Sequence, residues 1–238
     1  MPLVEMKAVA RKTISDNAPK LFFVSILYII IVTVMSELEF RLPGTLAAYE
    51  QYYQRLTAGE LPGLNTVYSN FRPSGAALAV VLWFMSSVLD AGFIIYSLKM
   101  VRGQDGGYKD IFDGFLYFGK IILIKLITTV LTILWSLLFF FPGIIAHYRY
   151  RQACYILLDA PQKSALQCIQ ESKRHMRGNK LDLFLLDLSF FGWFALDFLV
   201  TLLIPSPFAL PIVSIWLTPY LGLTRAAYYN RLMNRLTV

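Results

Sequence analysis

The sequence has few charged residues for its length. Asp, Glu, Lys and Arg make up 16% of the 238 residues, whereas 57% are hydrophobic and 15% are aromatic. A soluble domain has about a quarter charged and about half apolar residues. The apolar excess lies in long runs, such as the run from 121 to 141, which only Lys125 interrupts. This composition argues against a soluble globular domain and predicts a polytopic membrane protein.

Residues for metal, phosphate or covalent chemistry are equally scarce. The two cysteines and two histidines do not stand at a metal-ligand spacing, and the aspartates near the glycines at 103–107 do not form a calcium loop. No Gly-Lys-Ser/Thr phosphate loop, nucleophile elbow or pair of catalytic carboxylates stands out. We expect no enzymatic activity, catalytic residue, cofactor or metal. An intramembrane acid–base set drawn from His147 and Asp197 is the enzymatic alternative.

Basic residues exceed acidic ones, which gives a net charge of +7. They cluster beside the apolar runs, as the positive-inside rule requires, and no basic motif with a recognition fold accompanies them. We therefore expect the lipid bilayer as a partner and no nucleic acid. A membrane-protein partner and a homo-oligomer are both left open.

The apolar runs predict an all-α fold forming one integral membrane domain, 1–238. Six transmembrane helices are expected near 21–35, 74–100, 121–141, 143–159, 181–204 and 208–223. Amphipathic interfacial helices are expected on the cytoplasmic side at 1–20, within 99–120 and at 162–177. The outer loop, 36–73, should hold a short helix carrying Tyr49 and Tyr53. Pro142-Gly143 should end the third crossing, and Pro211 and Pro219 should kink the sixth.

The segment 143–159 decides between five and six crossings. If it stays outside, the loop 163–180, the most basic in the chain, also lies outside and violates the positive-inside rule. If it returns as a short fourth crossing, that loop and both termini are cytoplasmic. We expect six crossings, although Arg149 and Arg151 then lie on a crossing helix, which is costly unless they are paired or hydrated.

A helical-hairpin repeat is suggested by three lysines. Lys20, Lys120 and Lys180 each end a surface-lying segment and precede an outgoing and a returning helix. The repeats would be 1–100, 101–159 and 160–228. The alternative is that each crossing simply begins with a snorkelling lysine.

The charged residues inside the predicted crossings sum to zero; they are Asp90, Lys125, Arg149, Arg151, Asp187 and Asp197. Their depths, counted at about 1.5 Å per helical residue, predict three pairs: Lys125–Asp187, Asp90–Arg151 and Arg149–Asp197. With His147 as a titratable neighbour, they form the candidate polar site in the membrane. They are either buried pairs that fix helix docking, or the lining of a wet path for ions, protons or an amphiphile.

Short motifs between 98 and 229 lie mostly at membrane entries and turns. They include Asp110-Ile111-Phe112-Asp113-x-Phe115, Phe118-Gly119-Lys120, Pro142-Gly143-Ile144, Tyr148-Arg149-Tyr150 and Asp159-x-Pro161. Together they resemble a bacterial integral-membrane family catalogued as domain of unknown function 975. The resemblance implies a bacterial cytoplasmic membrane and a shared fold, without a settled activity.

A weaker similarity involves the stretch from Pro142 to Arg149 and the segment 172–178. It is similar to the membrane domain attached to some glycerophosphodiester phosphodiesterases. Their hydrolase domain is not seen in this sequence, so their activity is not carried over.

Two functional hypotheses follow. The leading one is a non-enzymatic, multi-pass protein of the bacterial cell membrane, with both termini cytoplasmic. Its intramembrane charges would serve transport, permeation or lipid handling. The alternative is an accessory or envelope-protection protein that docks a membrane partner, with the charges as structural pairs. A polar cavity reaching Arg149, Arg151 and Asp90 would favour the first, and a dry, paired core beside an exposed apolar groove the second.

Overall fold

The computed structural model describes residues 3–60, 71–203 and 212–236. Throughout these ranges the regular structure is helical, without strands. Four helical stretches are long and apolar enough to cross a membrane: Leu3–Arg41, Pro73–Val101, Tyr108–Leu138 and Lys180–Val200. The all-α class is confirmed, and these four stretches indicate a membrane-embedded protein. By themselves they do not give six crossings.

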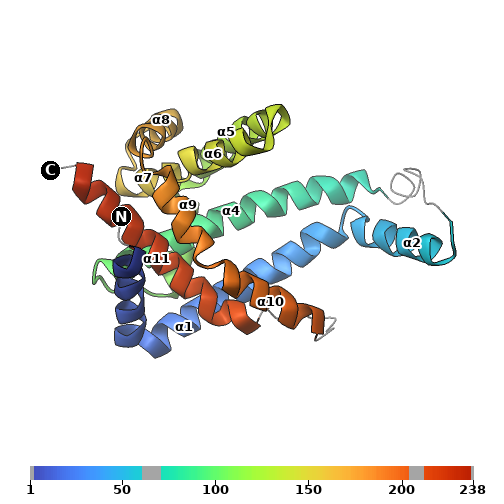
Figure 1. Cartoon of the computed structure of the whole chain (residues 1–238), viewed down its shortest axis with the longest axis horizontal. Helices are drawn as coiled ribbons and strands as arrows, with labels where there is room; N and C mark the ends of the chain where they lie inside the picture. Colours follow the sequence, from blue (N-terminus) through green and yellow to red (C-terminus); the bar gives the residue numbers. More distant parts are fainter. Residues whose placement is uncertain (1–2, 61–70, 204–211, 237–238) are drawn as a thin grey trace. The chain divides into compact units, whose positions relative to one another are not determined.

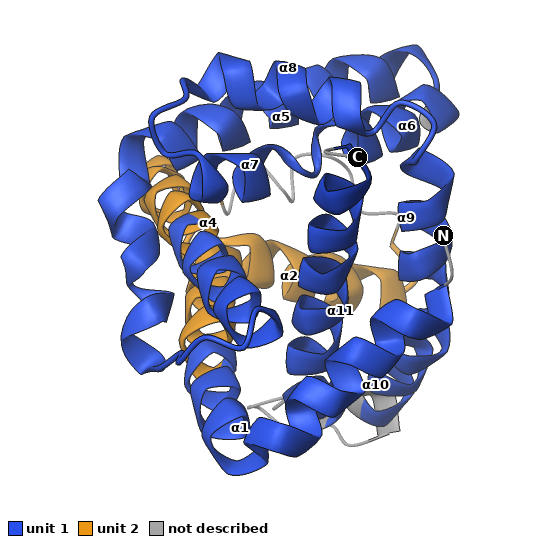
Figure 2. Cartoon of the chain, turned by 90° about the vertical axis from the view of Figure 1, so that its left-hand side faces the viewer, with its two compact units in different colours: residues 1–29, 88–238 blue, residues 30–87 orange. Residues whose placement is uncertain are grey.

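The chain forms two compact units, coloured separately in Figure 2. The first comprises Met1–Ile29 and Val88–Val238, and the second comprises Ile30–Ser87. The helices are labelled in Figure 1: α1 Leu3–Arg41, α2 Thr45–Thr57, α4 Pro73–Val101, α5 Phe118–Leu138, α6 Phe140–Tyr150, α7 Ala153–Asp159, α8 Ala165–His175, α9 Lys180–Leu188, α10 Phe191–Leu203 and α11 Ile212–Leu236. Two 3₁₀ turns, η1 (Tyr108–Ile111) and η2 (Asp113–Tyr117), lead into α5.

The expected end of the third crossing at Pro142-Gly143 is wrong by a few residues. The extended residue Phe139 (φ −160°, ψ 150°) separates α5 from α6. Pro142 lies in the first turn of α6, where its missing N–H removes no helical hydrogen bond. A Cβ at Gly143 would meet the Ser136 hydroxyl at 2.1 Å, so glycine permits α6 to double back closely against α5.

Three other predicted crossings differ from single straight helices. The segment 143–159 is divided between α6 and α7 at Arg151-Gln152, and the segment 181–204 between α9 and α10 at Ser189-Phe190. The expected end of the sixth helix at 223 is wrong, because α11 continues through Pro219 to Leu236. Pro211 and the turn at 205–207 lie outside the described residues.

Three glycines let other segments approach the second half of α4 closely. A Cβ on Gly92 would lie 1.7 Å from the Ile111 carbonyl oxygen, and one on Gly114 would lie 2.2 Å from the Val88 carbonyl oxygen. The turns η1 and η2 therefore cross α4 with backbone against backbone. On α11, a Cβ at Gly222 would meet the ring of Phe93 at 2.7 Å.

The N-terminal part of α1 packs against protein. The helix bends at Asn17 (φ −125°, ψ 19°), two residues before Pro19. Ahead of the bend, Met6, Ala10 and Ile14 form a buried stripe. Met6 belongs to a cluster with side chains of α9 and α11: Leu183, Leu186, Ala227, Tyr228 and Leu232. Protein covers Met6 in this stripe, and the expected interfacial position of the helix at 1–20 stays a prediction.

Helix α8 begins with a capping box and ends at a buried histidine. The Ser164 hydroxyl accepts from the Gln167 N–H, and the Gln167 side chain accepts from the Ser164 N–H. At the other end His175 is 8% exposed. Burial, followed by the positive charge of Arg174, lowers the pKa of His175 below its ordinary 6.5, against the opposing influence of Glu171.

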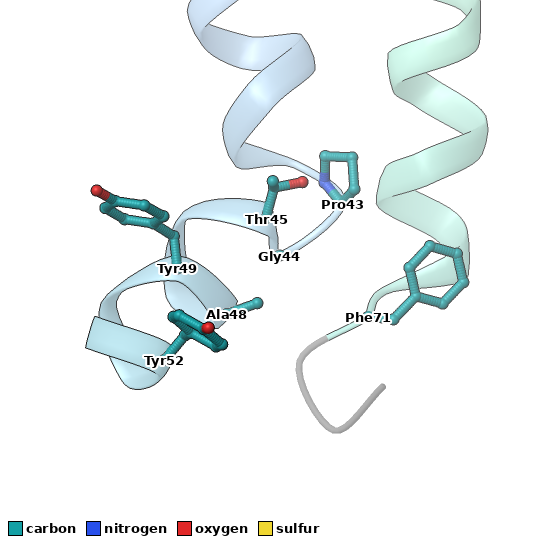
Figure 3. A pocket seen from close by; sticks show the side chains of 7 residues that line it. All are labelled: Pro43, Gly44, Thr45, Ala48, Tyr49, Tyr52 and Phe71. Carbon is teal, nitrogen blue, oxygen red and sulfur yellow. The ribbon is translucent and has the colours of Figure 1, made fainter. Parts of the chain in front are cut away.

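The second unit holds the helix expected in the outer loop. α2 carries Tyr49 and Tyr53 on its exposed surface. A hollow of about 260 Å³ lies between the turn at Pro43-Gly44, α2 and Phe71, as Figure 3 shows. Within this unit, the Ser86 hydroxyl donates to the Glu39 carboxylate at 2.9 Å.

The glycine contacts on α4 predict a stability difference. Gly92→Ala or Gly114→Ala should overpack the contact between α4 and the 3₁₀ turns and lower the free energy of unfolding by about 1–3 kcal/mol. Each kcal/mol lowers the melting temperature by about 2–4 °C. Gly119→Ala on α5 is the control, because a Cβ there meets nothing within 4 Å. Thermal unfolding in detergent would measure all three. Equal melting temperatures for Gly114→Ala and Gly119→Ala would contradict the packing.

His175 predicts a pH dependence. Its folded pKa is lowered, so the folded protein binds fewer protons than the unfolded chain. The stability from the neutral imidazole is present above the ordinary pKa and is lost as pH falls through the folded pKa. Melting temperature should drop between about pH 7.5 and about pH 5.5, and His175→Gln should drop less. Identical slopes for the two proteins would remove His175 as a cause.

Candidate functional site

Asp187 on α9 is the meeting point of three helices. Its Oδ1 accepts one hydrogen bond, at 3.0 Å, from Nε of Arg225 on α11. Nη2 of the same guanidinium lies 2.9 Å from Oδ1 as an ion pair. Its Oδ2 accepts from the hydroxyl of Tyr148 on α6 at 3.1 Å. Nη2 of Arg151, just after α6, lies 3.6 Å from the same Oδ2. We call Asp187, Tyr148, Arg151 and Arg225 the Asp187 cluster.

Arg151 is held more loosely than Arg225. A nitrogen–oxygen distance of 3.6 Å is an ion pair, but it is too long for a good hydrogen bond. Its guanidinium also contacts the His147 ring nitrogen one helical turn earlier, and it lies 5.9 Å from the centre of the Tyr148 ring. The His147 side chain is exposed at the border of the cluster.

The Asp187 cluster carries an excess of positive charge. One carboxylate faces two guanidinium groups, which stay protonated at any physiological pH. The side chains are 13% exposed for Asp187, 23% for Arg151 and 26% for Arg225. Charges in such partly buried surroundings are weakly screened, so the cluster should attract an anion.

The other predicted site residues lie in different settings. The Tyr28 hydroxyl of α1 donates to Asp90 at 2.7 Å, and the Tyr28 ring stacks on Phe93 with centroids 4.3 Å apart. Asp197 accepts from the Ser214 hydroxyl at 3.0 Å. The Arg149 guanidinium lies 5.8 Å from the centre of the Tyr150 ring.

The structure brings part of the predicted set together. The charges of Lys125, Arg151 and Asp187 all act on His147, as does that of Arg225. The expected pair Asp90–Arg151 is wrong, because Arg151 lies against Asp187. Asp187 contacts Arg225, Tyr148 and Arg151, and the expected Lys125–Asp187 pair stays a prediction. Arg149 and Asp197 have the separate contacts given above. Depth along straight helices fails as a guide where α6 and α9 end early.

Sequence reasoning missed Arg225, Tyr148 and Tyr28. Arg225 lies two residues past the predicted end of the sixth helix, so it is not among the predicted intramembrane charges. Extending that helix would have revealed that Arg225 and Asp187 lie at similar depths. Tyr148 and Tyr28 carry no charge and gave no signal among many aromatic residues. Adding Arg225 converts a balanced set of charges into a positive one.

Several helix ends of the first unit meet near one another. The Arg102 guanidinium donates to both oxygens of Asp159, at 2.8 and 2.9 Å, and to the Asn230 side chain. The hydrogen bonds with Asp159 raise the pKa of Arg102. The Lys120 ammonium donates to the Pro161 carbonyl oxygen at 2.5 Å. The end of α4, the start of α5, the end of α7 and part of α11 are thus connected.

No metal site is evident in the described part of the chain. Among its His, Cys, Asp and Glu residues, no group of three or more could hold a metal ion. The expectation that the protein uses no cofactor stays a prediction. The polar chemistry at the Asp187 cluster is that of arginine and tyrosine donors facing an anion.

Residues 139–236 match a family described as "Protein of unknown function (DUF975)". The matched range begins immediately before α6 and ends with α11, so it contains the whole Asp187 cluster and His147. The part of the resemblance between 98 and 138 lies outside this range. No curated protein and no solved structure matches the chain significantly. The similarity to the membrane domain of glycerophosphodiester phosphodiesterases stays a prediction.

Removing the carboxylate charge should destabilise the first unit. Asp187→Asn leaves two guanidinium groups facing each other, and breaking a buried ion pair costs on the order of 3 kcal/mol. Asp105→Asn is the control, because Asp105 is fully exposed beside Lys20 and its pair contributes little. Unfolding in detergent would compare them.

A double variant separates charge repulsion from lost packing. Adding Arg151→Gln to Asp187→Asn removes one repelling charge and should recover part of the stability. If Asp187→Asn unfolds like Asp105→Asn, Asp187 does not hold the helices together. If the double variant is less stable than Asp187→Asn, repulsion between the arginines is not the cause.

Proposed function

We propose that the chain is a non-enzymatic integral membrane protein of the bacterial cytoplasmic membrane that handles lipids, with the Asp187 cluster as its working site. The observation that carries the proposal is one carboxylate shared by two partly exposed guanidinium groups. The surplus positive charge is suited to the polar end of an amphiphile. The family resemblance supports the bacterial cytoplasmic membrane.

The proposed topology has six crossings with both termini in the cytoplasm. The bonds of Arg102 to Asp159 and Asn230, and of Lys120 to Pro161, support it. If α5 leaves the side where Lys120 lies, the chain has returned to that side by Pro161. The segment containing α6 and α7 is then the fourth crossing. The contact of Glu5 with Arg231 likewise supports both termini on one side.

The fifth and sixth crossings are supported by a series of contacts between α9–α10 and α11, which run alongside each other in Figure 1. The Ser214 hydroxyl donates to Asp197. The ring centroids lie 4.9 Å apart for Trp193 and Trp216 and 5.2 Å apart for Phe190 and Tyr220. Residue numbers rise on one helix as they fall on the other. That order is expected of an antiparallel hairpin.

Lipid handling is favoured over an ion path by the surroundings of the Asp187 cluster. Large apolar side chains are exposed on the neighbouring helices, including Leu181, Leu185 and Leu188 on α9 and Ile145 on α6. In a membrane these side chains face acyl chains. An amphiphile could therefore reach the cluster from the lipid, whereas an ion path needs polar walls across the bundle.

A second candidate function is favoured by one observation. Asp187 on α9 contacts Tyr148 of α6 and Arg225 of α11, so the only role of the cluster could be to hold these helices together. The protein would then be an accessory or envelope-protection protein with a membrane partner or a second copy. Water access to the cluster distinguishes the two functions.

Thiol labelling would test the topology. In a background with Cys154→Ala and Cys168→Ala, single cysteines replace Glu50 on α2 and Arg174 on α8, both exposed residues. A membrane-impermeant reagent should label Glu50→Cys in right-side-out spheroplasts and Arg174→Cys only in inside-out vesicles. Labelling of Arg174→Cys from the outside would exclude six crossings.

The same background tests whether the working site is hydrated. His147→Cys should react in inside-out vesicles, because it borders a polar cluster near the cytoplasmic side. Leu134→Cys is the matched control, since Leu134 is 58% exposed on α5 but should face lipid. If His147→Cys is as unreactive as Leu134→Cys, the cluster is dry and the accessory function is the better explanation.

A further inference from the structure

We infer that the Asp187 cluster binds the phosphate group of an anionic phospholipid, through the guanidinium groups of Arg151 and Arg225. The inference rests on the proposed lipid handling and names the class of lipid. It is carried by the convergence of donors on one point, by the charge they leave over and by the apolar surface beside them.

The donors converge from separate helices. Arg225 donates one hydrogen bond to the Asp187 carboxylate and has a second nitrogen 2.9 Å from it. Tyr148 donates its hydroxyl to the same carboxylate, and Arg151 lies 3.6 Å from it. Arginine's planar fork matches the oxygens of a phosphate, which offers more acceptors than a carboxylate. An oxygen placed beside Arg151 would give that guanidinium the short hydrogen bond that Asp187 does not supply.

The charge of the cluster should discriminate between anionic and zwitterionic phospholipids. With Asp187 ionised, Arg151 and Arg225 leave a net charge of +1. A phosphodiester carries one negative charge and would neutralise it. A zwitterionic headgroup brings an ammonium as well, which the two guanidinium groups would repel. The cluster should therefore prefer phosphatidylglycerol to phosphatidylcholine.

The position of the cluster suits a lipid better than a dissolved ion. Asp187 lies seven residues after Lys180, about 10 Å along the helix from the expected cytoplasmic entry. On the same helix Leu181, Leu185 and Leu188 are exposed, at 63%, 40% and 50%. A phospholipid could place its phosphate at the arginines and its acyl chains along these leucines.

The test uses the full chain in neutral detergent, with lipid binding followed by native mass spectrometry and by thermal unfolding. Phosphatidylglycerol should bind about tenfold more tightly than phosphatidylcholine, and Arg151→Gln should remove that preference. Arg149→Gln is the matched control. It removes the same charge two residues before Arg151, and the Arg149 guanidinium contacts the Tyr150 ring. It should keep the preference within about twofold.

Two further measurements keep the result decisive. Arg151→Lys retains the charge but loses the fork, so it should weaken the preference in a protein that folds even if Arg151→Gln does not. Inorganic phosphate, added without anionic lipid, examines the other source of the same group. Stabilisation by inorganic phosphate equal to that by phosphatidylglycerol would overturn the lipid assignment.

Two other outcomes would overturn the inference. One is equal binding of the two lipids by the unmodified protein. The other is an equal loss in Arg149→Gln and Arg151→Gln, which would reflect overall charge alone. Thiol reactivity at His147→Cys separates these failures from failure of the proposed function. A reactive thiol without lipid preference leaves a hydrated site for another ligand, whereas an unreactive thiol removes both proposals.

Discussion

The ion pair between Asp187 and Arg225 is the interaction on which the second half of the chain depends. A carboxylate removed from water is costly unless charged donors compensate for the lost hydration. Arg225 supplies a hydrogen bond and a positive charge, Tyr148 adds a hydroxyl and Arg151 adds a second positive charge. Satisfying this one acid requires α6, α9 and α11 to converge. Arg225 alone balances the charge of Asp187, so Arg151 adds a surplus positive charge. That surplus charge is the chemical feature available for binding.

Close packing around α4 complements this polar contact. Gly92, Gly114 and Gly222 allow the 3₁₀ turns and α11 to approach α4 more closely than side chains would permit. The far half of α5 and the part of α10 up to Leu199 instead expose large apolar side chains, as expected of surfaces that face lipid. A structural ion pair and a lipid-binding site would both use the residues of the Asp187 cluster, and hydration is what distinguishes them.

Much of the architecture could be predicted from local sequence. Helix α2, the helix α8 that Ser164 caps and the interruption near Pro142 all depend on short-range patterns. The ion pairs could not be predicted in the same way. Depth along an ideal helix assigned Arg151 to Asp90, but helix breaks at Arg151-Gln152 and Ser189-Phe190 change which side chains face each other. Arg225 was excluded because hydropathy ends α11 before its polar, but still helical, last turns.

The sequence by itself determined the membrane class, the helical content and the supply of intramembrane charges, because these follow from composition and from the length of apolar runs. Only the tertiary structure decided that Arg151 and Arg225 share Asp187, that Tyr28 bonds to Asp90 and that the N-terminal apolar stripe is covered by α9 and α11. The physical reason is that a charged or apolar face must be satisfied by some partner. Which partner satisfies it depends on the helices that packing brings within a few ångströms, and a linear pattern does not encode that distance.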